Sequence, residues 1–407
     1  MSRVTVTSPA GRSFLIDDER LAPHRDSATS KPAPLRLTYA AARVVMQEDY
    51  RKLAHSESRA GDAAEILESI DWEATLAQRR RLDALGFGIA EAMDTAQRFS
   101  LGWPAAVELI RRTGALGPKQ GFIAGAAADH LPELRSRSEL IDAVAHQAGI
   151  IQEHGGTVLL LPMPWLCEHE ASEAEYVEVY RAILEQLEGP LFLHWLGEGF
   201  LGRLRGYFPG ESFRRILALD PQKLRGAKLS LLEPAFEAGL RREMLEREQI
   251  LLSGDDLHFA ALLLGGDPAS PELAPALAQT MLGGRKIPLG DFSHALLGIL
   301  DGIAEPAALA LDFLSRGDAA RFLELMRPLE ALGRQVFAPP TRHYKAGLAF
   351  LAWLNGLQDN FMLVNHEEES RDVGYYSRTA ELAAAAGALT DAELARERLE
   401  TYWSQKP

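Results

Sequence analysis

The sequence has 407 residues, of which 47% are hydrophobic and 25% are charged, a composition that is ordinary for a soluble globular protein. Its net charge of −14 argues against nucleic acid and anionic membranes as main partners. The single cysteine, Cys167, excludes an internal disulfide framework, and no signal peptide or membrane-length apolar run is evident, so we expect a cytoplasmic protein.

The first part of the chain predicts a small β-structure that lies outside the main fold. Two short strands at 4–6 and 13–16 flank the turn residues 9–12, which is typical of a β-hairpin. Residues 22–34 are polar and contain prolines, as linkers often do. We therefore assign residues 1–34 to an N-terminal hairpin and linker.

Short apolar runs then alternate with amphipathic helical stretches. Seven strands are predicted, at 35–45, 86–93, 121–125, 157–162, 190–195, 225–230 and 250–253. From the second to the sixth, their starts are spaced by about 35 residues, enough for a strand, a loop and a covering helix. Repeated units of this kind favour a (β/α)8 TIM barrel over a doubly wound open sheet, which would need a glycine-rich phosphate loop after its first strand.

Two segments compete for the eighth strand that would close the barrel. Residues 286–291 follow a turn with two glycines, whereas residues 295–301 are more apolar and lead into a helix with Pro306 near its first turn. We favour 295–301, which makes 267–294 an inserted segment between strands seven and eight.

The barrel is then predicted to occupy residues 35–304. Residues 305–407 predict helices throughout, including the alanine-rich stretch 381–389. The predicted fold class is therefore α/β, a TIM barrel with an N-terminal β-hairpin and a C-terminal helical extension.

Lys228 lies in the sixth predicted strand, among apolar residues that indicate burial on both faces. A buried ammonium group is costly unless it is paired or has lost its proton. On position alone, a lysine that snorkels to the strand end or pairs with a buried acid is the commoner case. The other interpretation is an amine of lowered pKa that forms a Schiff base with a carbonyl compound.

In a TIM barrel the functional side chains lie at the carboxyl ends of the strands. This rule brings acids, histidines and aromatic residues to the same rim as Lys228. They are Glu91, Asp94, Asp129, His130, Pro164, Trp165, His194, Trp195, Glu198, Ser253, Asp255 and Asp256. Each has a structural explanation of its own, such as a helix cap for Asp94 or Asp255. Their convergence favours an active site.

Five segments also carry a family resemblance through their sequence and their order. They are 122–126 (FIAGA), 159–165 (LLLPMPW), 250–256 (ILLSGDD), 302–306 (GIAEP) and 314–318 (LSRGD). Over residues 35–355 the chain resembles the dihydrodipicolinate synthase and N-acetylneuraminate lyase family of class I aldolases, and within it a divergent bacterial branch of unknown function. The resemblance implies the barrel and its helical extension, a homodimer or homotetramer, and alignment of Lys228 with the Schiff-base lysine.

The chain departs from that family at two places. His194 stands where the family has a tyrosine that relays protons. Residues 92–96 replace the Gly-Thr-Thr-Gly-Glu loop that binds the carboxylate of a 2-oxo acid, and Asp94 brings a negative charge there. The substrate is therefore expected to be a carbonyl compound other than pyruvate, of neutral polyol or sugar-derived kind.

Our first hypothesis is a lyase, aldolase or dehydratase that uses a Schiff base and needs no cofactor. Lys228 would form the imine, and His194 would be the general acid/base because its reference pKa suits that role. Asp94, Thr95 and Asp129 would bind substrate hydroxyls. The predicted substrate-binding set is completed by Trp165, Trp195, Ser253 and Asp255.

Two alternatives stay open. A metal-dependent barrel hydrolase or isomerase would use His130, His194, Glu198 and Asp255 as ligands, although no His-x-His or His-Glu-x-x-His spacing is present. A barrel without catalysis, serving as a binding protein, would explain the altered carboxylate loop.

Overall fold

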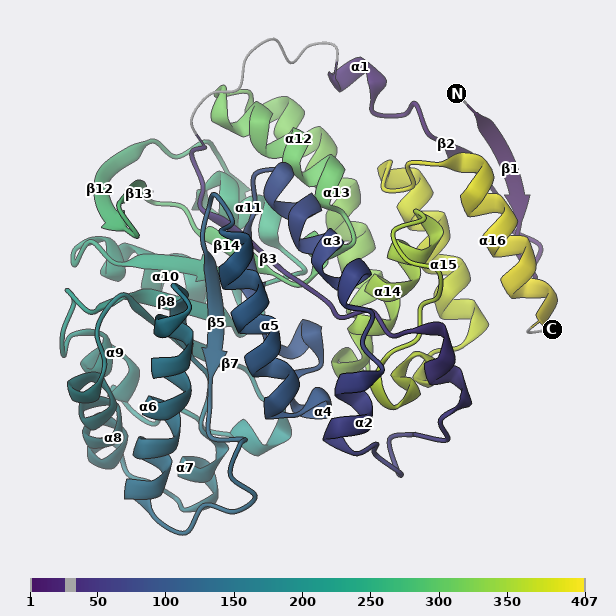
Figure 1. Ribbon diagram of the computed structural model, residues 1–407. Coiled ribbons are helices and arrows are strands. Elements are labelled where there is room, and N and C mark those ends of the chain that lie inside the picture. The colour runs from purple at the N-terminus through teal and green to yellow at the C-terminus, as the bar shows by residue number, and fades with distance from the viewer. Residues whose placement is uncertain (1, 26–33, 406–407) are drawn as a thin grey trace.

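The centre of the protein is a closed barrel of eight parallel strands, seen in a computed structural model that describes residues 2–25 and 34–405 (Figure 1). The strands are β3 (Thr38–Ala41), β4 (Gly88–Glu91), β5 (Phe122–Ala126), β6 (Thr157–Leu160), β7 (Leu191–Leu196), β8 (Leu224–Ser230), β9 (Ile250–Ser253) and β14 (His294–Leu297). They follow one another around the barrel in sequence order, and β14 pairs with both β9 and β3 to close it. The predicted TIM barrel is confirmed.

Helices cover the outer face of the barrel or lie beyond the carboxyl ends of its strands. They are α2 (Ala63–Glu68), α3 (Trp72–Ala84), α4 (Arg98–Leu101), α5 (Trp103–Leu116), α6 (Arg137–Glu153), α7 (Pro164–Glu168), α8 (Glu173–Gln186), α9 (Ser212–Leu217), α10 (Pro234–Leu245) and α11 (Phe259–Leu264). The short helices α2, α4 and α7 are those that lie beyond the strand ends (Figure 1). Helix α8 shows why they form: Ser172 and Glu175 make a reciprocal capping box, and Tyr176, Tyr180 and Ile183 form a buried stripe. In the described part of the chain, no helix has the length and apolar character needed to cross a membrane.

The eighth barrel strand overlaps the favoured segment 295–301, whose last residues form the 3-10 helix η4 (Ile299–Asp301). The competing segment belongs mainly to β13 (Arg285–Gly290), which pairs with β12 (Ala276–Leu282) in an antiparallel hairpin outside the barrel. A shorter hairpin, β10 (Gly266–Asp267) with β11 (Ser270–Pro271), precedes it.

The predicted N-terminal hairpin is confirmed as β1 (Arg3–Thr7) and β2 (Ser13–Asp17). It packs against α15 (Val373–Ala386) and α16 (Ala392–Gln405), so the first strands and the last helices of the chain lie side by side (Figure 1). Of the predicted linker 22–34, residues 22–25 form the short helix α1 (Ala22–Arg25), and residues 26–33 lie outside the described residues.

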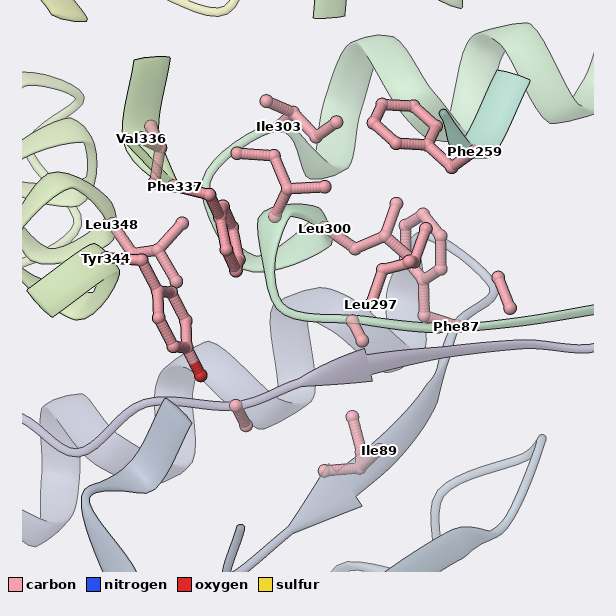
Figure 2. Close-up of a cluster of buried hydrophobic side chains, with 14 of the residues drawn as sticks. Phe87, Ile89, Phe259, Leu297, Leu300, Ile303, Val336, Phe337, Tyr344 and Leu348 are labelled. Carbon is pink, nitrogen blue, oxygen red and sulfur yellow. The ribbon is translucent and has the colours of Figure 1, made fainter. Parts of the chain in front are cut away.

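The predicted C-terminal helical region is also confirmed. It contains α12 (Ala304–Ser315), α13 (Ala319–Val336), η5 (Thr341–His343), α14 (Tyr344–Leu354), η6 (Val364–Ser370), α15 (Val373–Ala386) and α16 (Ala392–Gln405). Figure 2 shows Phe337 and Tyr344 packed close to Leu300 and Ile303, which follow the last barrel strand. The hydroxyl group of Tyr344 points out of this apolar cluster, so the extension presents a polar atom toward the barrel.

A buried ion pair fixes the end of β4. The Glu91 carboxylate accepts hydrogen bonds from Arg79 Nε at 2.9 Å and Arg79 Nη2 at 2.8 Å, and both side chains are fully buried. Glu91 also accepts from the Thr113 hydroxyl at 2.6 Å and from the backbone N–H of Ala92 at 2.8 Å. Ala92 has a φ of 49°, an unusual value for a residue with a side chain. Glu91, a rim candidate by sequence, therefore sets the path of the loop that follows.

Candidate active site

A cavity of about 670 Å³ opens at the carboxyl ends of the barrel strands. Its floor is formed by side chains from the ends of four strands (β4, β7, β8 and β9) and from the C-terminal region: Thr95, His194, Lys228, Ser230, Asp256 and Tyr344. This is the end of the barrel at which functional groups gather in TIM-barrel enzymes. The cavity is therefore the candidate active site.

Lys228 and His194 are direct neighbours in this site. They are paired residues of β8 and β7, and both side chains line the cavity. In the described part of the chain, no group makes a hydrogen bond or direct ion pair with Lys228 Nζ. Burial lowers the pKa of Lys228 to about 8, although the charges of Asp256 and Asp94 oppose the shift. About a tenth of the amine is consequently neutral at pH 7, far more than for a surface lysine.

Asp256 supplies the acid that faces Lys228. Its Oδ1 accepts a hydrogen bond from the backbone N–H of Ile299 at 2.8 Å, which fixes the carboxyl group between β9 and β14. Burial raises the pKa of Asp256 to about 7, against the lowering effect of that hydrogen bond and of Lys228. A carboxyl group with this pKa can give and take a proton near neutral pH.

Asp255 and Asp256 are neighbours in the chain, but only Asp256 lines the cavity. Asp255 was predicted to bind substrate, but its Oδ1 accepts from the backbone N–H groups of Leu257 at 2.9 Å and His258 at 3.1 Å. Its Oδ2 contacts His258 Nδ1 at 2.9 Å. Asp255 is thus the turn-forming residue, and Asp256 is the one in the cavity. The histidine three residues after Asp255 is the signal that could have separated the two.

His194 is buried and stays neutral at physiological pH. Its Nε2 lies 3.1 Å from the Ser230 hydroxyl, and its Nδ1 is a buried atom without a hydrogen-bond partner. Burial, and then the charge of Lys228, lower its pKa well below the usual value. The predicted acid/base role of His194 relied on the reference pKa of histidine, and the pKa of His194 in this buried site is much lower. A neutral imidazole with a free nitrogen is suited to hydrogen-bonding a bound molecule.

A hydroxyl pair links the barrel to the C-terminal region across the cavity. The hydroxyl groups of Thr95 and Tyr344 are 2.8 Å apart, and the Tyr344 ring stacks on Phe337 at 4.3 Å between centroids. Burial, and then the charge of Asp94, raise the pKa of Tyr344 well above its usual value, so the phenol keeps its proton. Tyr344 was not among the residues predicted for the site, because its segment carries neither a strand-end position nor a motif.

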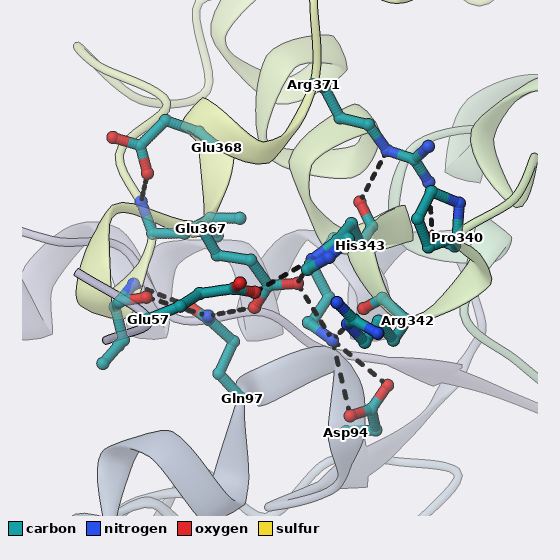
Figure 3. A network of polar contacts seen from close by, with 12 residues as sticks. Glu57, Asp94, Gln97, Pro340, Arg342, His343, Glu367, Glu368 and Arg371 are labelled. Carbon is teal, nitrogen blue, oxygen red and sulfur yellow. Dashed lines mark hydrogen bonds and ion pairs between the residues drawn. The ribbon is translucent and has the colours of Figure 1, made fainter. Parts of the chain in front are cut away.

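Asp94 lies at the rim, where a polar network joins it to the same C-terminal region (Figure 3). Its carboxylate is 3.4 Å from Lys345 Nζ, which is also 3.3 Å from Glu367. Glu367 accepts a hydrogen bond from Gln97 Nε2 at 2.7 Å and contacts His343 Nδ1 at 3.2 Å. The negative charge at Asp94 is thus partly balanced within the protein.

The other predicted substrate-binding residues divide into two groups. Trp165 and Asp129 line the cavity, but the Asp129 carboxylate already accepts from Arg98 Nη2 at 2.9 Å and Gln147 Nε2 at 3.0 Å. Trp195 and Ser253 do not line it. Side chains alternate across a strand, so Trp195, next to His194, faces the helices and packs on Phe213 at 4.6 Å between centroids.

Ser253 also faces away from the cavity, because side chains alternate across its strand. It follows Leu252, which faces the barrel interior, and its hydroxyl donates to Glu237 Oε2 at 3.2 Å on the helix side. The positions of Trp195 and Ser253 therefore differ from the predicted ones.

The four ligands of the metal alternative do not come together. His194 is in the cavity, whereas His130 Nδ1 lies 3.0 Å from Gln147 Nε2 outside it. Glu198 is exposed beside Arg205, and Asp255 holds His258. Among residues 2–25 and 34–405, no three His, Cys, Asp or Glu side chains are gathered as a metal ion requires. The arrangement does not fit the proposed metal centre.

Gly254 packs directly against the amine end of the Lys228 side chain. A Cβ atom added there would lie 2.7 Å from Lys228 Cε and 2.8 Å from the Leu229 carbonyl oxygen. We expect Gly254→Ala to lower the free energy of unfolding by about 1–3 kcal/mol through overpacking and to displace the amine. Urea denaturation gives the first value. An unchanged free energy of unfolding would show that the Lys228 side chain can move away from the added methyl group without cost.

The family model described as "Protein of unknown function (DUF993)" matches residues 12–406. The chain belongs to this family. A search of curated protein sequences finds no match.

Solved structures with the same fold come from enzymes of the dihydrodipicolinate synthase type. Dihydrodipicolinate synthase from Acinetobacter baumannii, solved with pyruvate, is 14% identical with a TM-score of 0.59, covering 87% of this chain and 99% of that one. The enzyme from Oceanobacillus iheyensis is 14% identical with a TM-score of 0.57, covering 91% and 98%. A 2-keto-3-deoxygluconate aldolase variant from Sulfolobus solfataricus, in a pyruvate complex, is 11% identical with a TM-score of 0.55, covering 89% and 99%. The fold implied by the sequence resemblance is thereby confirmed.

Proposed function

We propose that the protein is a class I aldolase-type lyase, which breaks or forms a carbon–carbon or carbon–oxygen bond through a Schiff base at Lys228. The observation that carries the proposal is the unpaired Lys228 amine, with a pKa of about 8, in a cavity of about 670 Å³. A buried lysine with only a structural role would be expected to form an ion pair or hydrogen bonds, because an unpaired buried charge is costly. The fold that the chain shares with an aldolase also supports a Schiff-base lyase.

The reaction begins with attack of the neutral Lys228 amine on the carbonyl carbon of the substrate. The carbonyl oxygen takes up two protons and leaves as water, and a C=N bond replaces the C=O bond. The protonated imine then accepts an electron pair. In cleavage the pair comes from the Cα–Cβ bond, and the β-hydroxyl proton passes to a base. In elimination it comes from a Cα–H bond, and the β-hydroxyl group leaves as water. Either step leaves an enamine. After cleavage the enamine takes up a proton at Cα and becomes an imine again, and in elimination its electron pair re-forms the C=N bond as the β-hydroxyl group leaves. Hydrolysis of this imine consumes one water and returns the free lysine.

Asp256 is our proposed proton carrier for these steps. It lies in the cavity with Lys228, and its pKa of about 7 lets it accept the proton at one step and return it at another. We propose that His194, kept neutral, hydrogen-bonds the reacting oxygen through Nδ1. The Thr95–Tyr344 hydroxyl pair can donate a second hydrogen bond from the opposite side. The expected cytoplasmic location and homodimer or homotetramer stay predictions.

Reduction of the imine tests the proposal. Incubation with small ketones and aldehydes, followed by borohydride, should add the mass of the reduced compound to the peptide that contains Lys228. Lys286, which is exposed on β13, serves as the internal control for unspecific modification. If Lys228 is modified no faster than Lys286 by every carbonyl compound, the lyase proposal fails and a binding role becomes the better one.

The pH dependence of imine formation is a separate prediction. Only the neutral amine reacts, so the rate at Lys228 should rise as pH rises from 6 through the pKa of about 8 and level off above it. A surface lysine should continue to gain reactivity to about pH 10. Initial rates of reductive modification with cyanoborohydride, followed by mass spectrometry at both sites, distinguish the two profiles. Parallel profiles would contradict a lowered pKa.

Asp256→Asn should separate imine formation from proton transfer. Asparagine can still accept the Ile299 N–H, while loss of the charge that raises the Lys228 pKa should move the imine profile to lower pH. Exchange of the ketone's α-hydrogens with deuterated solvent, measured by NMR, should fall by about 100- to 10,000-fold, because it needs a base. Unchanged exchange in the variant would assign the base to another group.

A further inference from the structure

The polar and apolar side chains of the cavity are separated from one another. The groups able to make hydrogen bonds to a reacting centre lie on the floor, around Lys228 and Asp256. The loops that follow β5, β6 and β7 supply an apolar wall, made by Leu134, Leu161, Met163, Trp165, Leu196 and Phe200. The same loops also bring the polar side chains of Asp129, Glu133, Glu168, His169 and Arg203 to the cavity. A ligand that fills the cavity must therefore present a different chemistry to each side.

Each polar side chain of this wall has a bonding partner within the protein: Glu133 accepts from Arg135 at 3.3 Å, and His169 Nδ1 lies 2.8 Å from the Trp165 carbonyl oxygen. The Asp129 carboxylate is held by Arg98 and Gln147, and the Trp165 indole N–H donates to the Leu134 carbonyl oxygen at 3.3 Å. At the mouth, Glu168 accepts from Arg203 Nε at 2.6 Å. A hydroxyl group placed against this wall would lose its water partners and gain none, which is costly.

The size of the cavity is a second argument for an apolar group on the ligand. Its volume of about 670 Å³ lies in the range of pockets that enclose ligands much larger than a three-carbon acid. A small ketone bound at Lys228 would leave the apolar wall in contact with water. An apolar group that displaced this water would gain affinity.

From the separation of floor and wall we infer that the substrate is a ketone or aldehyde with an apolar arm, whose carbonyl group reaches Lys228 while the arm lies against the β5–β7 wall. The inference rests on the proposed Schiff-base function and specifies its substrate class. It differs from the polyol or sugar-derived substrate expected from the sequence, for which Asp94, Thr95 and Asp129 were the assigned hydroxyl ligands. Asp129 is bonded to Arg98 and Gln147, and Asp94 is paired with Lys345 at 3.4 Å, while Thr95 belongs to the polar floor.

A homologous series of methyl ketones tests the inference. For acetone, butan-2-one, pentan-2-one, hexan-2-one and octan-2-one, the concentration that gives half-maximal borohydride trapping at Lys228 is measured by mass spectrometry. Each methylene group buried against the wall should lower this concentration by about four-fold until the cavity is filled. Dihydroxyacetone, which has the carbon chain of acetone and two added hydroxyl groups, is the matched polar compound and should require a higher concentration than butan-2-one.

A variant of the wall links the effect to this cavity. Phe200→Ser, in the half-buried loop after β7, should reduce the ratio of half-trapping concentrations between acetone and octan-2-one by about ten-fold. Two results would overturn the inference and leave the proposed function intact: equal concentrations along the series, or tighter trapping of dihydroxyacetone than of hexan-2-one. If none of the compounds is trapped at Lys228 above the level at Lys286, the proposed function itself fails.

Discussion

Replacing Lys228 with methionine should abolish carbonyl trapping, with a loss of at least about 100-fold relative to the native chain, because no other lysine among the described residues lines the cavity. Methionine has a similar length and no charge, so it fills the space beside Gly254. The free energy of unfolding should change by no more than about 1.5 kcal/mol, as for other volume-conserving replacements in a core. Loss of trapping would then report chemistry and not unfolding.

The matched control is Lys286→Met on the exposed face of β13, which should leave trapping at Lys228 unchanged. Mass spectrometry of the trapped protein and urea denaturation of both variants complete the comparison. Continued trapping elsewhere in the cavity after Lys228→Met would place the reactive amine on a different residue and contradict the assignment.

The second large effect concerns the stability of the fold, which depends on the buried ion pair of Glu91 and Arg79. Glu91→Ala should lower the free energy of unfolding by about 3–5 kcal/mol, because it leaves the fully buried guanidinium group of Arg79 without its counter-charge. It also removes the acceptor of the Thr113 hydroxyl and the Ala92 N–H. Because Ala92 leads directly into the loop with Asp94 and Thr95, trapping at Lys228 should weaken as well.

Two controls define this effect. Glu108→Ala removes a surface partner of Arg111 and Arg112 and should cost no more than about 1 kcal/mol. The double variant Glu91→Leu with Arg79→Met removes both buried charges and should be more stable than Glu91→Ala alone. Urea denaturation measures all three. A double variant no more stable than Glu91→Ala would mean that the unpaired charge is not the cause of the loss.

The barrel was predictable from the sequence because its evidence is local. Each βα unit has its own apolar strand and amphipathic helix, and the unit length repeats. Lys228 was found for the same reason, since a charge in an apolar strand is visible without knowledge of the fold. The positions of Trp195 and Ser253 could have been corrected by strand alternation, counting outward from the inward-facing His194 and Leu252.

The rest of the site depends on contacts between distant segments. Tyr344 meets Thr95 across 249 residues of sequence, and no periodicity in α14 singles out a tyrosine among its many buried residues. Asp256 was separated from Asp255 only by the direction in which each side chain leaves the turn. The lowered pKa of His194 needs the three-dimensional burial that a reference value cannot contain.

The Thr95–Tyr344 contact has a consequence for the order in which the protein becomes functional during synthesis. All eight barrel strands precede Tyr344 in the chain, so a ribosome releases a complete set of strands before this residue, which lines the same cavity as Lys228. Domains can fold progressively as they emerge. The barrel can thus be assembled while the cavity around Lys228 still lacks one of its walls, and the cavity is complete only when the C-terminal helices dock.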